Sequence, residues 1–117
     1  MTEAILYHNP RCSKSRGALE LLQENGVEPR IVRYLETPPD LATLRDLLTK
    51  LGMAPRELLR RSEDEYRALN LDDPGLHDEA ILKAMVEHPK LIERPFLVVG
   101  ARAVVGRPPE RVLELIR

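Results

Sequence analysis

The chain contains a single cysteine, Cys12, in a setting that favours thiol chemistry. One thiol cannot form an internal disulfide, and one cysteine with three histidines cannot build a four-ligand zinc site, so we expect no metal site. Cys12 lies between a predicted strand and the start of a predicted helix. A helix start presents unpaired backbone N–H groups and the positive end of the helix dipole, and both favour a thiolate. We therefore interpret Cys12 as a reactive nucleophile.

The residues around Cys12 are those that could tune a thiol. Arg16 is a cation one helical turn further on, and His8 ends the preceding strand. The pattern from Cys12 to Ser15 is C-x-x-S, so an adduct on Cys12 must be resolved by a thiol from another molecule. Ser15 either donates a hydroxyl hydrogen bond to the thiolate or bonds the backbone at the helix start. His8 either tunes the thiol or packs as an ordinary strand-end residue.

The first third of the chain predicts a βαβ unit. Residues 4–8 form a short apolar run that ends at the turn signal Asn9-Pro10. Leucines at helical spacing predict a helix from Ser13 to about Asn25, and residues 29–35 predict a second strand. Two strands joined by a helix lie parallel in one sheet, so Cys12 is expected at the crevice edge of that sheet.

The middle of the chain is predicted to be helical, and its last part returns to strands. Residues 96–99 and 103–105 predict two strands joined by a tight hairpin, and Pro108-Pro109 opens a last helix. The element order is β-α-β, helices, β-β-α, which indicates an α/β fold with a mixed sheet. Arg94 and Arg107 flank these two strands, where sheet termini border a crevice.

Six motifs spread over the whole chain carry a family resemblance. They are His8-Asn9-Pro10-Arg11-Cys12-Ser13-Lys14-Ser15-Arg16, Tyr34-Leu35-Glu36-Thr37-Pro38-Pro39, Leu58-Leu59-Arg60-Arg61, Glu87-His88-Pro89, Ile92-Glu93-Arg94-Pro95 and Val105-Gly106-Arg107-Pro108-Pro109-Glu110. Together they closely resemble the glutaredoxin-coupled arsenate reductases. The resemblance implies a thioredoxin-like fold, with a helical insertion between the second and third strands. We expect a single domain over residues 1–117, with the insertion at about 40–88.

The resemblance also implies a reaction, the reduction of arsenate to arsenite. In it, Cys12 attacks arsenate, glutathione displaces the arsenic oxyanion to a mixed adduct, and glutaredoxin completes the reduction. Glutathione is then a co-substrate, and no tightly bound cofactor is expected. Arsenate is mostly a dianion near neutral pH, so a thiolate can attack it only where cations neutralise the oxyanion.

The family resemblance assigns roles to further residues. The arginines that match Arg60, Arg94 and Arg107 bind the oxyanion and its reduced product, and a guanidinium group matches that geometry better than an ammonium group. Arg61 is as basic as its neighbour Arg60, and only the motif match selects between them. The proline that matches Pro95 is cis and lies against the catalytic cysteine. The residues that match His8 and Ser15 tune the thiol.

Composition limits the other classes of partner. The 18 Lys and Arg residues against 19 Asp and Glu residues leave a net charge of −1, which argues against broad binding of nucleic acid or anionic lipid. No apolar run approaches the roughly 20 residues needed to span a bilayer, and the first residues do not resemble a secretory signal. We expect a monomeric cytoplasmic protein with neither a nucleic acid nor a membrane as partner.

Two other functions remain open from the sequence. One is a glutathione-dependent thiol transferase of the same fold, which would not need arginines converging on Cys12. The other is a redox-related transcriptional regulator that binds RNA polymerase, although Ser15 removes the internal disulfide switch of a C-x-x-C protein.

Overall fold

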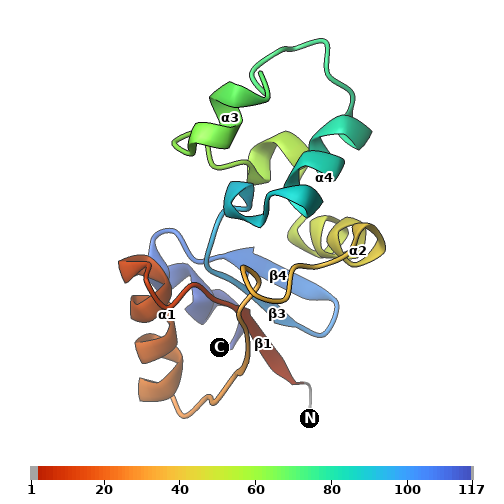
Figure 1. Cartoon of the computed structure of the whole chain (residues 1–117). Helices are drawn as coiled ribbons and strands as arrows, with labels where there is room; N and C mark the ends of the chain where they lie inside the picture. Colours follow the sequence, from red (N-terminus) through yellow and green to blue (C-terminus); the bar gives the residue numbers. More distant parts are fainter. Residues whose placement is uncertain (1–2, 117) are drawn as a thin grey trace. The chain divides into compact units, whose positions relative to one another are not determined.

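The computed structural model describes residues 3–116 of the chain. They divide into two compact units. The first contains the residues up to Thr37 and those from Arg94 onward, and the second is the continuous segment Pro38–Glu93. In Figure 1 the first unit is coloured red to orange and, after the second, blue, whereas the second runs from yellow to light blue. The second unit is longer than the predicted insertion of about 40–88.

The first unit is built on a four-stranded mixed sheet in the order β2-β1-β3-β4. β1 pairs in parallel with β2 and antiparallel with β3, which pairs antiparallel with β4. The predicted βαβ unit is confirmed, because α1 connects the parallel strands. The bounds are β1 (Ala4–Tyr7), α1 (Ser13–Glu24), β2 (Arg30–Val32), β3 (Phe96–Val99), β4 (Arg102–Val105) and the 3₁₀ helix η3 (Pro109–Leu115).

One face of this sheet forms the core of the first unit. Leu6, Leu97 and Val104 are paired across the three neighbouring strands β1, β3 and β4, so their side chains form a row on one face. α1 and η3 pack against each other, and their buried side chains join this row in one cluster. The members from the helices are Ala18, Leu22 and Val112. Side chains alternate between the two faces along each strand, so this row identifies the face of the sheet that the helices cover.

Two elements of the first unit differ from the sequence prediction. β2 is shorter than 29–35 because the chain turns at Arg33, whose carbonyl oxygen accepts the N–H groups of Glu36 and Thr37, both at 2.9 Å. The last helix is a 3₁₀ helix rather than an α-helix. Val112 and Leu115 are three residues apart, and a 3₁₀ helix of three residues per turn places both against the core cluster.

The second unit consists of short helices. The Asp40 side chain caps α2 by accepting the N–H of Thr43 at 2.8 Å, and Gly52 ends this helix with φ of 66°. Asp and Gly are residue types typical of these two helix ends. The bounds are α2 (Leu41–Leu51), the 3₁₀ helix η1 (Pro55–Leu58), α3 (Asp64–Ala68), α4 (Asp78–Glu87) and the 3₁₀ helix η2 (Pro89–Leu91).

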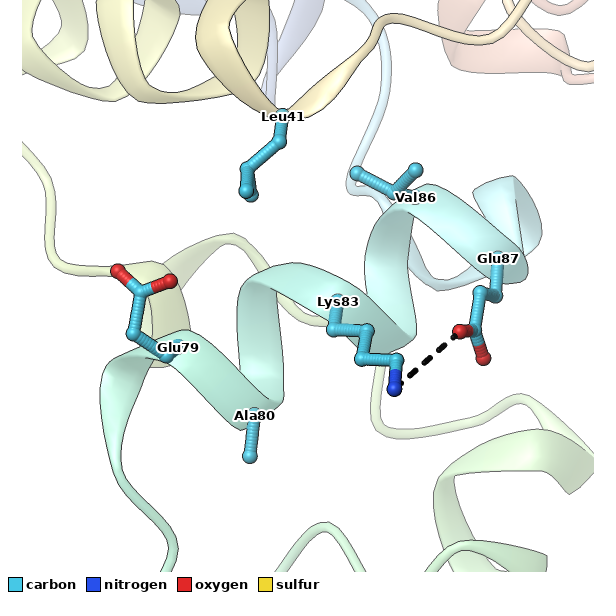
Figure 2. A pocket seen from close by; sticks show the side chains of 6 residues that line it. All are labelled: Leu41, Glu79, Ala80, Lys83, Val86 and Glu87. Carbon is cyan, nitrogen blue, oxygen red and sulfur yellow. Dashed lines mark ion pairs between the residues drawn. The ribbon is translucent and has the colours of Figure 1, made fainter.

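Packing between α2 and α4 organises the second unit. The fully buried side chains include Leu44 from α2 and Ile81 from α4, and an ion pair between Arg45 and Glu79 links the two helices. A cavity of about 350 Å³ lies where the start of α2 faces α4. Figure 2 shows Leu41 above the side chains of α4 that line this cavity. No helix in the described part of the chain is both long and apolar enough to cross a membrane.

Candidate active site

Cys12 is the N-cap residue of α1, directly after the loop that follows β1. Its N–H donates to the carbonyl oxygen of Asn9 at 3.0 Å, and the side-chain Oδ1 of Asn9 accepts the N–H of Arg11, also at 3.0 Å. Asn and Pro are typical of the first positions of such a turn, so Asn9-Pro10 explains the local fold. Cys12 is neither fully buried nor fully exposed.

The surroundings of Cys12 favour its thiolate. Burial alone would raise the pKa of the Cys12 thiol, but hydrogen bonds from the backbone N–H groups of Ser15 and Lys14 lower it, and so does the Arg94 guanidinium. Together these groups hold the pKa below its usual value. Arg94 acts both through its positive charge and through a side-chain hydrogen bond to the sulfur. The helix start and one arginine therefore activate the thiol.

Arg94 reaches Cys12 because of the sheet topology. β1 and β3 are antiparallel neighbours with Tyr7 opposite Phe96, so the loop after β1 and the segment before β3 meet at the same sheet edge. The aromatic rings of these two residues stack with centroids 4.4 Å apart. Arg94 is the second residue before Phe96 and is 9% exposed. The edge of the sheet thus holds a nearly buried cation beside the thiol.

Arg107 joins Arg94 at this edge. Its Nη1 donates to the carbonyl oxygen of Arg94 at 3.0 Å, which links the end of β4 to the start of β3. The Arg94–Pro95 peptide bond is cis, the isomer implied by the family resemblance. The Arg107–Pro108 bond is also cis, and no feature of the sequence indicates this isomer. The structure therefore brings Arg94 and Arg107 together, as their places at strand ends indicate.

A buried hydrogen-bond network lies beneath the Cys12 loop. The Ser15 hydroxyl oxygen is 2.8 Å from Nδ1 of His8 and accepts the N–H of Asn9 at 3.0 Å. Ser15 is fully buried, and His8 and Asn9 are nearly so. The hydroxyl is thus engaged with the end of β1, and it is the backbone N–H of Ser15 that lowers the Cys12 pKa. Asn9 is therefore a site residue, although in the sequence it is recognisable only as a turn signal.

His8 is held as a neutral ring. Burial lowers the pKa of the His8 side chain, and the charges of Arg33 and Arg16 lower it further. A neutral imidazole adds no positive charge near Cys12, and the His8 ring contacts the Ser15 hydroxyl. The Arg16 guanidinium donates from Nη1 to the carbonyl oxygen of Pro10 at 3.1 Å and so braces the loop. That His8, Ser15 and Arg16 tune the thiol stays a prediction.

Arg60 belongs to the second unit, where acidic side chains hold it. Its Nε lies 3.3 Å from a Glu63 carboxylate oxygen, and its Nη1 lies 3.3 Å from a Glu93 carboxylate oxygen. The Arg60 side chain is 18% exposed, whereas its neighbour Arg61 is an exposed residue. The orientation of Arg60 is therefore better defined than that of Arg61. Its binding of an oxyanion stays a prediction.

Comparison with known proteins identifies the family. The model of the ArsC family matches residues 7–115. The chain belongs to the ArsC family. It is 60% identical to the uncharacterized protein YfgD of Escherichia coli K12, over 99% of each chain. It is 49% identical to the arsenate reductase of Neisseria meningitidis serogroup A, over 96% of this chain and 97% of that protein.

A solved ArsC-related structure supports the same conclusion. The arsenate reductase from Vibrio cholerae superposes with a TM-score of 0.94 at 48% identity, over 97% of each chain. These matches confirm the family resemblance and the thioredoxin-like fold that the sequence motifs indicated. The range that the ArsC model matches contains Cys12 and the arginines at the edge of the sheet. The site described above therefore lies in the part of the chain that defines the family.

Proposed function

We propose that the protein is an arsenate reductase in which the Cys12 thiolate attacks the arsenic atom. The observation that carries this proposal is the Cys12 thiol with a lowered pKa beside the nearly buried Arg94. A thiolate and an arsenate dianion repel each other, and a guanidinium group offsets that repulsion in the transition state. Membership of a family that includes proteins named arsenate reductase supports arsenate as the substrate.

In the first step a sulfur–arsenic bond forms on Cys12. The thiolate donates an electron pair to arsenic, and one arsenate oxygen leaves with two protons as water. Arg94 and Arg107 lie at the sheet edge where the remaining oxygens need positive charge. Arg60 is proposed as a third ligand of the oxyanion. Arsenic is still pentavalent after this step, so a second thiol is required to reduce it.

Glutathione supplies the second thiol, because the chain has only one cysteine. Its thiolate attacks the Cys12 sulfur, a disulfide bond forms, and arsenic leaves with the electron pair of the broken sulfur–arsenic bond. Arsenic is thereby reduced from the pentavalent to the trivalent state and leaves as arsenite. Glutaredoxin then reduces the mixed disulfide and restores the Cys12 thiol. Because the cycle consumes reduced thiols, we place it in the cytoplasm.

A coupled assay tests this function. NADPH oxidation is followed in the presence of glutathione, glutathione reductase and glutaredoxin, with and without arsenate. We expect arsenate-dependent oxidation with the unaltered protein and none with Cys12→Ser. Ser13→Ala, at the exposed residue next to Cys12, is the control for the folded helix start. Turnover by Cys12→Ser would exclude the mechanism, and reduction of a glutathione mixed disulfide without any response to arsenate would assign a thiol transferase instead.

A further inference from the structure

A small charged cavity lies beside the Cys12 loop in the first unit. Its volume is about 230 Å³, and residues 8–11 form one wall. The other wall is formed by Arg33, Leu35 and Glu36, which follow β2. Cys12 itself does not line the cavity, but it directly follows the lining residue Arg11. The cavity is therefore adjacent to the nucleophile and distinct from the groups that contact its sulfur.

The topology places this cavity on the opposite side of Cys12 from Arg94. In the sheet, β1 lies between β2 and β3, and Cys12 follows β1. The cavity is formed with the segment after β2, whereas Arg94 and Arg107 come from the segments next to β3 and β4. The loop that carries Cys12 thus has a cavity on one side and the oxyanion-binding arginines on the other.

The cavity carries two cations and one anion. Arg11, Arg33 and Glu36 are all exposed, and none of their side chains forms an ion pair within residues 3–116. Arg33 is close enough to the inner end of the cavity to lower the pKa of His8. The half-exposed Leu35 adds an apolar wall. This set is complementary to a small ligand with two carboxylates, one ammonium group and a short apolar stem.

We propose that this cavity binds glutathione, whose thiol then attacks the Cys12 adduct; this rests on the proposed function. Glutathione has two carboxylates, which pair with Arg11 and Arg33, and one ammonium group, which pairs with Glu36. An extended tripeptide spans about 10 Å, so a molecule seated in the cavity can bring its central cysteine to the next residue after Arg11.

The two-sided arrangement suits the displacement step. The glutathione sulfur attacks the Cys12 sulfur, the sulfur–sulfur bond forms, and the sulfur–arsenic bond breaks with its electron pair going to arsenic. Displacement at sulfur is favoured when the attacking and leaving atoms lie in line on opposite sides. The cavity supplies the attacking thiol from the β2 side, and arsenite leaves on the β3 side, toward Arg94 and Arg107.

Binding of S-methylglutathione tests the cavity without any reaction, because this analogue has no free thiol. Titration calorimetry is performed with the unaltered protein, Arg11→Ala, Arg33→Ala and Glu36→Gln. We expect each substitution to weaken binding by about threefold to tenfold, as for a partly exposed ion pair. Lys83→Ala is the matched control, because Lys83 is a cation that lines the separate cavity of the second unit (Figure 2). Unchanged affinity in all three cavity variants would overturn the proposal.

Kinetics separate this proposal from the proposed function. Arg11→Ala and Arg33→Ala should raise KM for glutathione by about threefold to tenfold and leave KM for arsenate unchanged. With 2-mercaptoethanol, a thiol without carboxylates, the same variants should react at the rate of the unaltered protein. Normal arsenate turnover with an unchanged KM for glutathione would overturn the cavity assignment alone. Binding of S-methylglutathione through Arg11 and Arg33 without arsenate turnover would support the cavity and overturn the arsenate reaction alone.

Discussion

The reactivity of Cys12 depends on opposing effects on the pKa of its thiol. Burial favours the thiol, whereas backbone N–H groups and Arg94 favour the thiolate and prevail. We expect Arg94→Ala to raise the pKa of Cys12, because the substitution removes both a positive charge and a hydrogen bond from the sulfur. Titration of the thiolate by ultraviolet absorbance, or the pH dependence of alkylation by iodoacetamide, measures this shift. Arg94→Lys should raise the pKa less, because it keeps the charge.

Arg102→Ala is the control for the Arg94 experiment, because it also removes one arginine charge, from an exposed position in β4. The pH at which Cys12 ionises should not change in this variant. An equally unchanged value in Arg94→Ala would contradict the predicted role of Arg94. The backbone N–H groups at the start of α1 would then account for the whole effect.

His8 predicts a pH dependence of folding. Its pKa is lowered in the folded protein, so the unfolded chain binds a proton more readily below the ordinary histidine value of about 6.5. The stability that His8 contributes is complete above that pH and is lost as pH falls toward the lowered value. We expect the free energy of unfolding to fall as the pH drops below about 6.5. His8→Asn should flatten this dependence in urea titrations.

His77→Asn provides the comparison for His8. His77 is an exposed histidine at the N-cap of α4. Its replacement by Asn removes a histidine at a position outside the buried network of His8, Asn9 and Ser15. Equal slopes in His8→Asn and the unaltered protein would show that the buried ring does not govern this pH range.

At the residue scale, the sequence predicts the place of Cys12 more reliably than its contacts. A helix stop, a turn signal and leucine spacing are local, and they locate Cys12 at the start of α1. The His8 ring, which is the partner of the Ser15 hydroxyl, cannot be identified from such local signals. The contact between Ser15 and His8 forms because the loop from His8 to Cys12 turns back over the helix start. The two residues are seven positions apart in the chain, and this spacing alone does not reveal the contact. The sequence therefore predicts a role for Ser15 but does not identify the partners of its hydroxyl group.

The Ser15 hydroxyl is one of the groups that hold the β1–α1 connection. Ser15→Ala leaves Nδ1 of His8 and the N–H of Asn9 without this partner in a buried place. We expect a loss of about 1–3 kcal/mol in the free energy of unfolding, the usual cost of a buried polar group left unpaired. Urea denaturation measures the loss. Ser13→Ala, the same substitution at the exposed first residue of α1, should change stability by less than about 0.5 kcal/mol.

The connection from β4 to η3 needs a glycine for close approach. The N–H of Gly106 donates to the carbonyl oxygen of Pro95 at 2.8 Å. A Cβ at position 106 would lie 3.0 Å from Val112 and 3.1 Å from the Pro95 ring, closer than ordinary contact. We expect Gly106→Ala to destabilise the protein by about 1–3 kcal/mol in thermal or urea unfolding.

Gly17→Ala is the matched comparison for Gly106→Ala. Gly17 lies inside α1, and a Cβ there would meet Pro109 at 3.5 Å, an ordinary contact distance. Alanine has the higher helix propensity, so we expect a gain of up to about 1 kcal/mol. A loss of stability in Gly17→Ala as large as that in Gly106→Ala would contradict this explanation. The distances from the added Cβ to its neighbours would then not determine the change in stability.

Elements with strong local signals were predicted from the sequence, and elements that depend on pairing were not. The strands β3 and β4, the Asp40 cap and the stop at Gly52 follow from residue types. β2 ends early because the backbone of Arg33 turns, and η3 is a 3₁₀ helix because its packing repeats every three residues. Both outcomes depend on contacts with distant parts of the first unit.

At the scale of the whole molecule, the chain leaves the first unit and returns to it. Cys12 and Arg94 meet in this unit although residues 38–93 separate its two segments. The order of strands in the sequence predicts the return, because the last two strands need a partner to form a mixed sheet. The end of the second unit at Glu93 is less predictable, since it depends on the bridge between Leu59 and Ile92. Local periodicity does not show such a pairing.

The net charge of −1 means that the molecule as a whole does not attract an anion. Attraction of arsenate must then come from the arginines at the site, and their field is screened beyond about 10 Å at 0.1 M salt. We expect kcat/KM for arsenate to fall only about twofold to fivefold between about 0.05 M and 0.5 M salt. Alkylation of ionised Cys12 by the neutral reagent iodoacetamide should stay nearly constant over this range. A fall of about a hundredfold for arsenate would instead demonstrate long-range steering by the whole chain.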